Sequence, residues 1–241
     1  MAYVTAGHPS AAETAVFLRG APAAGVDVVE LGVPWSDPVA DGPTIQASIH
    51  AALAGGMTLG AALALLSGPE RTVPAVVFSY LNPLLAFGPA RFALAARGAG
   101  AAGVLVTDLP VGADEAVEAE LASTGLPLVR LVAPTTPAAR QTLIARHSQG
   151  FVYLVSRLGV TGETATVSRT LEPQLAALRA ATRLPIAVGF GISTPEQAAA
   201  VARLADGVVI GSAVVARMAS GGAAAALDWL RTVRAALDAR G

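Results

Sequence analysis

Short apolar runs that recur along the whole chain constrain its fold more than any other feature of the sequence. Each run is rich in Val, Leu and Ile and is bounded by Gly, Pro or polar residues, which is typical of buried strands. Alanine- and leucine-rich stretches with helical spacing lie between the runs. The predicted strands cover Ala2–Thr5, Val26–Leu31, Val73–Ser79, Gly103–Val106, Leu126–Val132, Phe151–Ser156, Ile186–Gly189 and Gly207–Ile210.

The stretches between these runs predict helices. Pro137 and Pro195 each follow a threonine suited to cap a helix, so both are predicted at a first helical position. Eight strand–helix units, roughly 25 residues apart, favour a single (β/α)₈ TIM barrel over residues 1–241. An open doubly wound sheet is the alternative, but a Gly-x-Gly-x-x-Gly fingerprint is absent after the first strand. Helical spacing is found in Ala11–Ala24, Ala90–Ala99, Asp114–Thr124, Pro137–His147, Leu171–Ala181 and Pro195–Leu204.

The composition excludes several classes of function. The net charge of −1, without a basic block, gives no electrostatic footprint for nucleic acid. No apolar segment reaches 18 residues unbroken, and the first residues resemble a strand rather than a signal peptide, so we expect a cytoplasmic protein. Without cysteine, disulfides and thiolate sites are excluded, and the scattered His8, His50 and His147 predict no metal site.

The chain also lacks lysine, since all 16 basic residues are arginine. A Schiff base with substrate, a covalently held pyridoxal cofactor and a Walker-type phosphate loop each need a lysine amine. A lysine-dependent aldolase is therefore excluded.

In a barrel, chemistry takes place where the strands end, and the second strand ends with an unusual group of carboxylates. Glu30 closes this apolar strand, and the proline-rich loop that follows carries Asp37 and Asp41. In a dry barrel mouth the pKa of Glu30 would rise, which suits an acid or base near neutral pH. The alternatives are a Glu30 paired with an arginine, and a purely structural role for one of the two aspartates.

Glycines after the late strands predict a phosphate site. Gly191 follows the seventh strand, Gly211 and Ser212 follow the eighth, and Gly162 lies in the loop after the sixth. Glycine lets the backbone approach a phosphate, and a helix N-terminus supplies N–H donors. Tight turns that need glycine are the alternative interpretation.

Aromatic and hydroxyl side chains near the strand ends are further candidates for substrate binding. Tyr153 lies within the sixth strand, where its phenol points either into the barrel or outward into the helix layer. Phe190 and Tyr80 either form walls around an aromatic substrate or pack in the core. Thr161 lies in a glycine-flanked loop that is long enough to act as a lid.

Three long motifs carry a resemblance to a known family. Val29–Gln46, Tyr153–Gly162 and Gly189–Ser193 are similar to the signatures of the tryptophan synthase alpha subunit, in the same order along essentially the whole chain. The resemblance implies a (β/α)₈ barrel that cleaves indole-3-glycerol phosphate to indole and glyceraldehyde 3-phosphate. This substrate supplies its own electron sink when indole C3 is protonated, which agrees with the missing lysine.

The resemblance also implies roles for individual residues. Glu30 matches the catalytic glutamate, and Asp41 matches the aspartate that accepts the indole N–H. Tyr153 matches the pocket tyrosine, and Thr161 matches a lid threonine. The matches to the phosphate site are Gly162, Gly191 and Ser212.

For partners, the resemblance implies a beta subunit in an α₂β₂ complex. Pro34 and Asp37 match the face toward that subunit, which alone holds pyridoxal phosphate. The chain departs from the family in three ways: His8 replaces an aspartate, Trp35 replaces a smaller aromatic, and the helix below the barrel floor is missing or shortened. Two alternative functions are a weakly active subunit that mainly binds its partner, and a lyase that works alone and releases indole.

Overall fold

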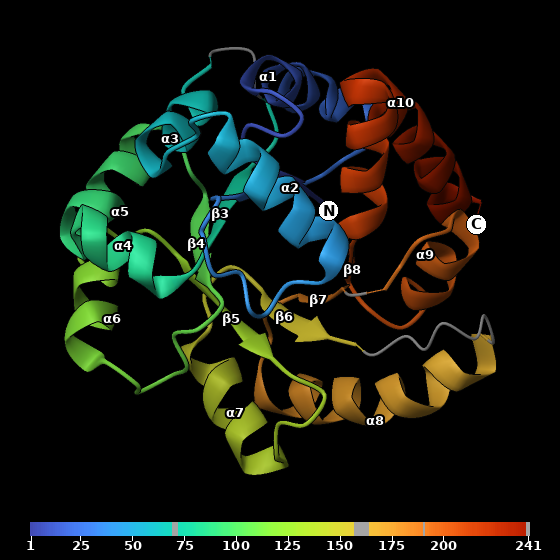
Figure 1. Cartoon of the computed structure of the whole chain (residues 1–241). Coiled ribbons are helices and arrows are strands. Elements are labelled where there is room, and N and C mark those ends of the chain that lie inside the picture. Colours follow the sequence, from blue (N-terminus) through green and yellow to red (C-terminus); the bar gives the residue numbers. More distant parts are fainter. Residues whose placement is uncertain (69–71, 157–163, 190, 240–241) are drawn as a thin grey trace.

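Eight parallel strands form one sheet in the order in which they occur along the chain (Figure 1). The computed structural model describes residues 1–68, 72–156, 164–189 and 191–239, with the backbone alone for 164–170. Each strand pairs with the next, as expected for strand–helix repeats. The strands are β1 Ala2–Thr5, β2 Val29–Gly32, β3 Ala75–Ser79, β4 Gly103–Val106, β5 Leu128–Val132, β6 Val152–Val155, β7 Ile186–Gly189 and β8 Gly207–Val209.

The sheet closes on itself between its first and last strands. Ala2 forms a parallel bridge with Ile210, and the Tyr3 N–H donates to the Ile210 carbonyl at 2.9 Å. The Ile210 N–H donates in turn to the Met1 carbonyl at 3.2 Å. These bonds confirm the predicted barrel and exclude the open doubly wound sheet.

Prolines explain why some strands begin later than predicted. β3 begins at Ala75 rather than Val73, and β5 at Leu128 rather than Leu126. Pro74 and Pro127 precede these strands and have no N–H to donate to a ladder. Their carbonyls still accept bonds from the neighbouring strands, at 3.0 and 2.8 Å. β2 begins at Val29 rather than at the predicted Val26. The predicted start belongs to a turn, in which the Val26 N–H donates to the Ala21 carbonyl.

Helices surround the barrel, and several begin with the capping groups that their sequences offer. Thr194 forms a capping box with Gln197, which confirms Pro195 at the first helical position. The same prediction is wrong for Pro137, which is the cap residue before the helix, while the Thr136 hydroxyl accepts the Ala133 N–H instead. The helices are α1 Ala11–Gly20, η1 Pro22–Ala24, α2 Pro43–Ala54, α3 Leu59–Leu66, α4 Leu81–Phe87, α5 Pro89–Gly98, α6 Glu115–Ala122, α7 Ala138–His147, α8 Thr164–Ala181, α9 Pro195–Val201 and α10 Ser212–Asp238.

Helix α10 is the longest helix, and the side chain of another helix holds it at its break. Gly221 and Gly222 have non-helical backbone angles, so the second half of α10 starts anew. The Glu13 carboxylate on α1 accepts the Ala223 N–H at 2.6 Å. The Glu13 carboxylate accepts a backbone N–H that has no acceptor within the helix, and its negative charge complements the helix dipole. The bond also connects α1 to α10.

Helix α2 lies across the carboxyl ends of the strands rather than beside the barrel wall (Figure 1). Its Ile45 and Ile49 pack with Tyr3 and Phe78 from the strands and with Val215 from α10. This packing makes α2 one wall of the barrel mouth. No single described helix is long and apolar enough to cross a membrane; α2 and α3 qualify together by length and composition, but they are bent by 100°.

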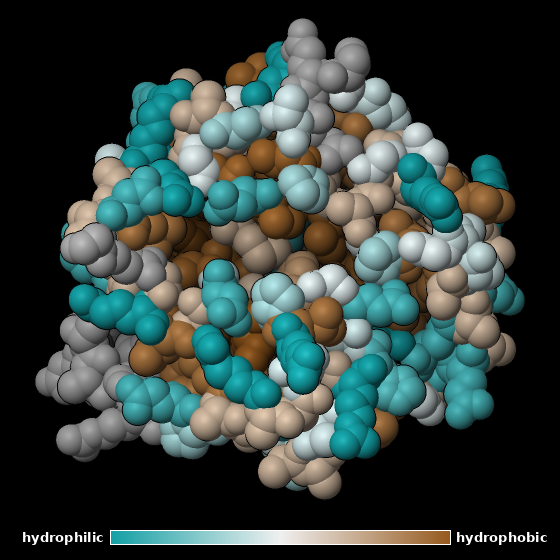
Figure 2. Space-filling view, turned by 180° about the vertical axis from the view of Figure 1, so that it is seen from behind, coloured by the Kyte–Doolittle hydropathy of each residue, from teal (hydrophilic) through white to brown (hydrophobic). Residues whose placement is uncertain are grey.

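The opposite end of the barrel is open. In the described residues no helix precedes β1, and a cavity of about 550 Å³ lies at the amino ends of the strands. Apolar residues gather at the centre of this face inside a polar ring (Figure 2). The cavity lining includes Met1, Val28, Phe151, Pro185 and Leu237, with Asp27, Asp206 and Arg234. This cavity is therefore separate from the strand ends at which catalytic residues gather in such barrels.

Candidate active site

Glu30 points into the barrel. Its neighbours Val29 and Leu31 pack outward against the helices, and side chains alternate along a strand. In the sheet Glu30 lies between Tyr3 of β1 and Val76 of β3, both of which also face inward. The Glu30 side chain is therefore part of the barrel interior, as the sequence analysis required of an acid or base.

The Glu30 carboxyl is buried, and no described side chain forms an ion pair with it. The residue is 1 % exposed, and its Oε1 atom has no hydrogen-bond partner. Among the described residues no arginine pairs with it, so the alternative of a structural ion pair is not observed there. Burial raises the pKa of Glu30 to about 8. A carboxyl with this pKa is mostly protonated at neutral pH and can both donate and accept a proton.

Two of the three tyrosines of the chain, Tyr3 and Tyr153, lie near Glu30, and the third, Tyr80, lies near Asp41. Tyr3 and Tyr153 point into the barrel, which decides between the two orientations considered for Tyr153. A Cβ added to Gly32 would lie 2.1 Å from the Tyr3 hydroxyl, and one added to Gly189 would lie 2.2 Å from the Tyr153 hydroxyl. These two glycines therefore give the phenols their space.

The interior phenols stay protonated. Burial raises the pKa of both Tyr3 and Tyr153 above the ordinary value, and the charges of Glu30 and Asp41 raise it further. Each hydroxyl can therefore donate a hydrogen bond into the barrel mouth. Tyr3 was not among the residues predicted for the site, although its position between the outward-facing Ala2 and Val4 already indicated an inward side chain.

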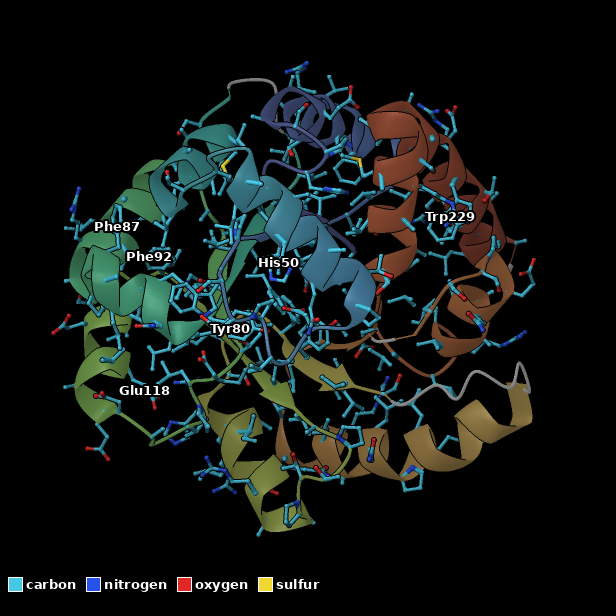
Figure 3. The ribbon with its side chains drawn as sticks, viewed as in Figure 1. His50, Tyr80, Phe87, Phe92, Glu118 and Trp229 are labelled. Atoms are coloured by element: carbon cyan, nitrogen blue, oxygen red, sulfur yellow. The ribbon has the colours of Figure 1, made fainter. Side chains whose placement is uncertain are left out.

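Asp41 lies in the β2–α2 loop and is held by Tyr80. The Tyr80 hydroxyl donates to Asp41 Oδ2 at 2.7 Å and accepts the Ala40 N–H at 3.0 Å. Burial raises the pKa of Asp41, and the bond from Tyr80 acts against this increase. Tyr80 is only 2 % exposed, so it offers little surface to a substrate and instead contacts the loop (Figure 3).

The rest of the β2–α2 loop has one buried side and one exposed edge. Pro34 is buried, whereas Asp37 is exposed and accepts a hydrogen bond from the Ser36 hydroxyl at 2.5 Å. Val39 is 83 % exposed, which is the largest value among the exposed large apolar residues of the described chain. The exposed edge thus combines a carboxylate with an apolar side chain.

The predicted phosphate glycines follow the last two strands. Gly191 has a φ of +78°, a conformation that favours glycine. Gly211 precedes α10, which begins at the exposed Ser212. The Val214 and Val215 N–H groups donate to the Gly211 carbonyl, whereas the N–H groups ahead of them, at the start of the helix, have no acceptor within the helix. Gly162, Thr161 and Phe190 lie outside the described residues, and the described residues contain no cluster of His, Asp and Glu suited to a metal.

Comparisons with known proteins agree with this geometry. A family model described as "Tryptophan synthase alpha chain" matches residues 1–236. Tryptophan synthase alpha chains of Gluconacetobacter diazotrophicus and of a Geobacter species are 45 % and 50 % identical to this chain. These matches cover 99 % and 88 % of this chain, and 89 % and 80 % of those proteins.

The chain belongs to the tryptophan synthase alpha chain family.

Solved structures of tryptophan synthase show the same architecture. The alpha subunit from Legionella pneumophila matches with a TM-score of 0.89 at 34 % identity, over 99 % of this chain and 92 % of that one. A chain of aminoacrylate-bound tryptophan synthase from M. tuberculosis matches with a TM-score of 0.88 at 30 % identity, over 98 % and 91 %. The family and barrel predictions are confirmed. The chain is a carbon–carbon lyase of tryptophan biosynthesis that cleaves indole-3-glycerol phosphate to indole and glyceraldehyde 3-phosphate.

Proposed function

We propose that Glu30 is the acid–base residue of this cleavage. A proton is added to indole C3, which creates a positively charged indoleninium ring. The side-chain hydroxyl then loses a proton, the bond from C3 to the side chain breaks, and its electron pair restores the indole ring while the hydroxyl carbon becomes an aldehyde. One proton is added and one is removed, so a single carboxyl that first donates and then accepts can balance the reaction.

The observation that carries this proposal is the buried, inward-facing Glu30 carboxyl. Its raised pKa of about 8 leaves a protonated acid in the barrel at neutral pH. The interior phenols of Tyr3 and Tyr153 lie close enough to this carboxyl for its charge to raise their pKa. They are suited to hydrogen-bond the polar side chain of the substrate.

Asp41 is proposed to accept the indole N–H, where positive charge develops when C3 is protonated. A carboxylate at that position stabilises the charged ring more than a neutral acceptor does. The phosphate is proposed to bind at Gly191, Gly211 and Ser212 together with Gly162, because the first turn of α10 supplies N–H donors and a positive dipole end. Thr161 is proposed to close over the bound substrate. The chain itself is proposed to need no cofactor.

The exposed edge of the β2–α2 loop is proposed to bind a beta subunit in an α₂β₂ complex in the cytoplasm. Asp37 and Val39 offer a charge and an apolar contact there, next to the loop that carries Asp41. Pro34 supports this edge from its buried side. Pyridoxal phosphate is proposed to belong only to the beta subunit.

An assay of indole formation tests the proposed function. Purified chain with indole-3-glycerol phosphate should release indole, and a beta subunit should increase the rate. Equal rates with and without the beta subunit, and no detectable complex, would instead indicate a lyase that works alone. Absence of cleavage in both conditions would contradict the roles of Glu30 and Asp41.

A negative charge at the start of α10 should block phosphate binding. Because aspartate is favourable in the first turn of a helix, Ser212→Asp should fold normally, yet its carboxylate would repel the substrate phosphate. We expect KM to rise roughly fivefold or more, since two like charges about 4 Å apart repel each other by about 1 kcal/mol in bulk water and by more near a protein surface. Steady-state kinetics and thermal unfolding check both effects.

Ser220→Asp is the matched control, because it adds the same charge to an exposed position near the end of the first half of α10. Its KM should stay close to that of the unmodified chain. An unchanged KM in Ser212→Asp would show that the phosphate binds elsewhere.

A further inference from the structure

The carboxylate of Asp41 depends on a side chain from a different strand. Tyr80 follows β3 directly, and its hydroxyl reaches across to Asp41 Oδ2 at 2.7 Å. The same hydroxyl accepts the Ala40 N–H at 3.0 Å, so one phenol holds both the carboxylate and the backbone before it. The phenol thus fixes the loop and its reactive group together.

Tyr80 itself is rigidly placed. Its ring is buried, its carbonyl accepts a hydrogen bond from the Ser79 hydroxyl at 3.0 Å, and the next N–H, of Leu81, donates to Asp108 Oδ1 at 2.6 Å. Asp108 belongs to the segment after β4, and so Tyr80 is anchored to two neighbouring strands of the barrel. Figure 3 shows Tyr80 at the inner side of α4, facing the β2–α2 loop.

The Gln46 side chain also holds the β2–α2 loop, but it does not contact the Asp41 carboxylate. The Gln46 amide donates to the backbone carbonyls of Asp41 and Pro38, at 2.9 and 3.2 Å. Among the described residues, Tyr80 is the one side chain that donates to the Asp41 carboxylate. No described arginine forms an ion pair with it. The orientation of the carboxylate therefore depends on a single hydrogen bond.

We infer that Tyr80 is a positioning residue for Asp41: its hydroxyl occupies one carboxylate oxygen and leaves the other directed at the ring nitrogen of the substrate. This inference rests on the proposed role of Asp41. A bond to the charged form of a carboxylate favours ionisation, so Tyr80 also opposes the effect of burial on Asp41. Tyr80 acts through Asp41 and does not itself touch the reacting atoms.

Removal of the hydroxyl by Tyr80→Phe tests the inference. A hydrogen bond to a charged group is worth enough to lower kcat/KM roughly 10- to 100-fold. The loss should be mostly in kcat, because the pocket keeps its shape. The acidic limb of the pH profile of kcat/KM should also move to higher pH, because Asp41 without the phenol binds a proton more readily. The alkaline limb, which Glu30 sets, should stay in place.

The pH readout separates positioning from a structural role. Among the described residues, the titratable groups that interact with Asp41 are Tyr3, Tyr80 and Tyr153. Glu30 interacts with Tyr3 and Tyr153, and Asp108 with Tyr80, so Tyr80→Phe leaves the other four groups intact. A merely structural defect would lower activity at every pH and leave the acidic limb unmoved. Gln46→Leu, which cuts the backbone tether only, is the matched control and should leave that limb unchanged.

Two further variants keep the inference falsifiable. In an Asp41→Asn background, Tyr80→Phe should cause little additional loss. If Tyr80→Phe does not fold, 3-fluorotyrosine introduced at position 80 keeps the ring and strengthens its donation, and it should move the acidic limb to lower pH.

The outcomes separate a failure of the proposed function from a failure of the positioning role of Tyr80. An Asp41→Asn variant with normal turnover would overturn the proposed function itself. An impaired Asp41→Asn variant, together with a Tyr80→Phe or fluorotyrosine variant whose acidic limb does not move, would overturn only the positioning role of Tyr80.

Discussion

Glu30→Gln should lower kcat roughly 10²- to 10⁴-fold while the fold and substrate binding remain, because a well-placed acid–base group contributes an acceleration of this size. Glutamine has nearly the same shape as glutamic acid but can neither donate a proton to indole C3 nor accept one from the side-chain hydroxyl. Since Glu30 Oε1 has no hydrogen-bond partner, the substitution breaks no bond at that atom. Single-turnover measurements with indole-3-glycerol phosphate separate the loss of chemistry from any loss of binding.

Glu120→Ala provides the control for this measurement. Glu120 is an exposed glutamate on α6, on the outside of the barrel, and its removal should leave turnover unchanged. Near-normal turnover in Glu30→Gln would contradict the assigned role, whatever its effect on stability.

Asp41→Asn is the second large expected effect, with a loss in kcat/KM of roughly 10²- to 10³-fold, the size seen when one group that stabilises developing charge is removed. The amide oxygen can still accept the indole N–H, and the amide NH₂ group, at the position of the other oxygen, can donate to the Tyr80 hydroxyl in place of accepting from it. The missing part is the negative charge that balances the protonated ring. The loss should therefore be in kcat rather than in KM, and steady-state kinetics measure both.

Asp37→Asn is the matched control for Asp41→Asn, because it changes an exposed aspartate of the same loop. The chain assayed alone should retain its cleavage rate in this variant. Equal losses in the two variants would point to a general defect of the loop and not to charge stabilisation by Asp41.

The fold was predictable because its signals are local. Each strand is a short apolar run and most connections carry a predicted helical pattern, so the order of elements needed no knowledge of distant contacts. The strand boundaries were less accurate where a proline entered a run: Pro74 and Pro127 join the apolar pattern but cannot donate to a ladder. The placement of α2 across the barrel mouth depends on its contacts with Tyr3, Phe78 and Val215, which are far apart in the sequence.

For the site, the sequence indicated which residue types lie at the strand ends more clearly than what each side chain contacts. Glu30 was predictable, because a carboxyl at the end of an apolar strand is unusual. Tyr80 was considered only as a wall around an aromatic substrate or as a core side chain, since a sequence shows a ring but not where its hydroxyl reaches. Gly189 provides space for the Tyr153 hydroxyl, and the orientation of Tyr153 could not be decided before the register was known.

The titration of the Glu30 carboxyl carbon, followed by ¹³C NMR in the intact chain and assigned by its absence in Glu30→Gln, tests the central claim most directly. If burial in the barrel keeps the Glu30 carboxyl protonated at neutral pH, its resonance should titrate with a pKa of about 8. A titration near 4.5, the ordinary value for a glutamate, would mean that the carboxyl is already ionised at neutral pH, and it would contradict the account of how indole C3 receives its proton.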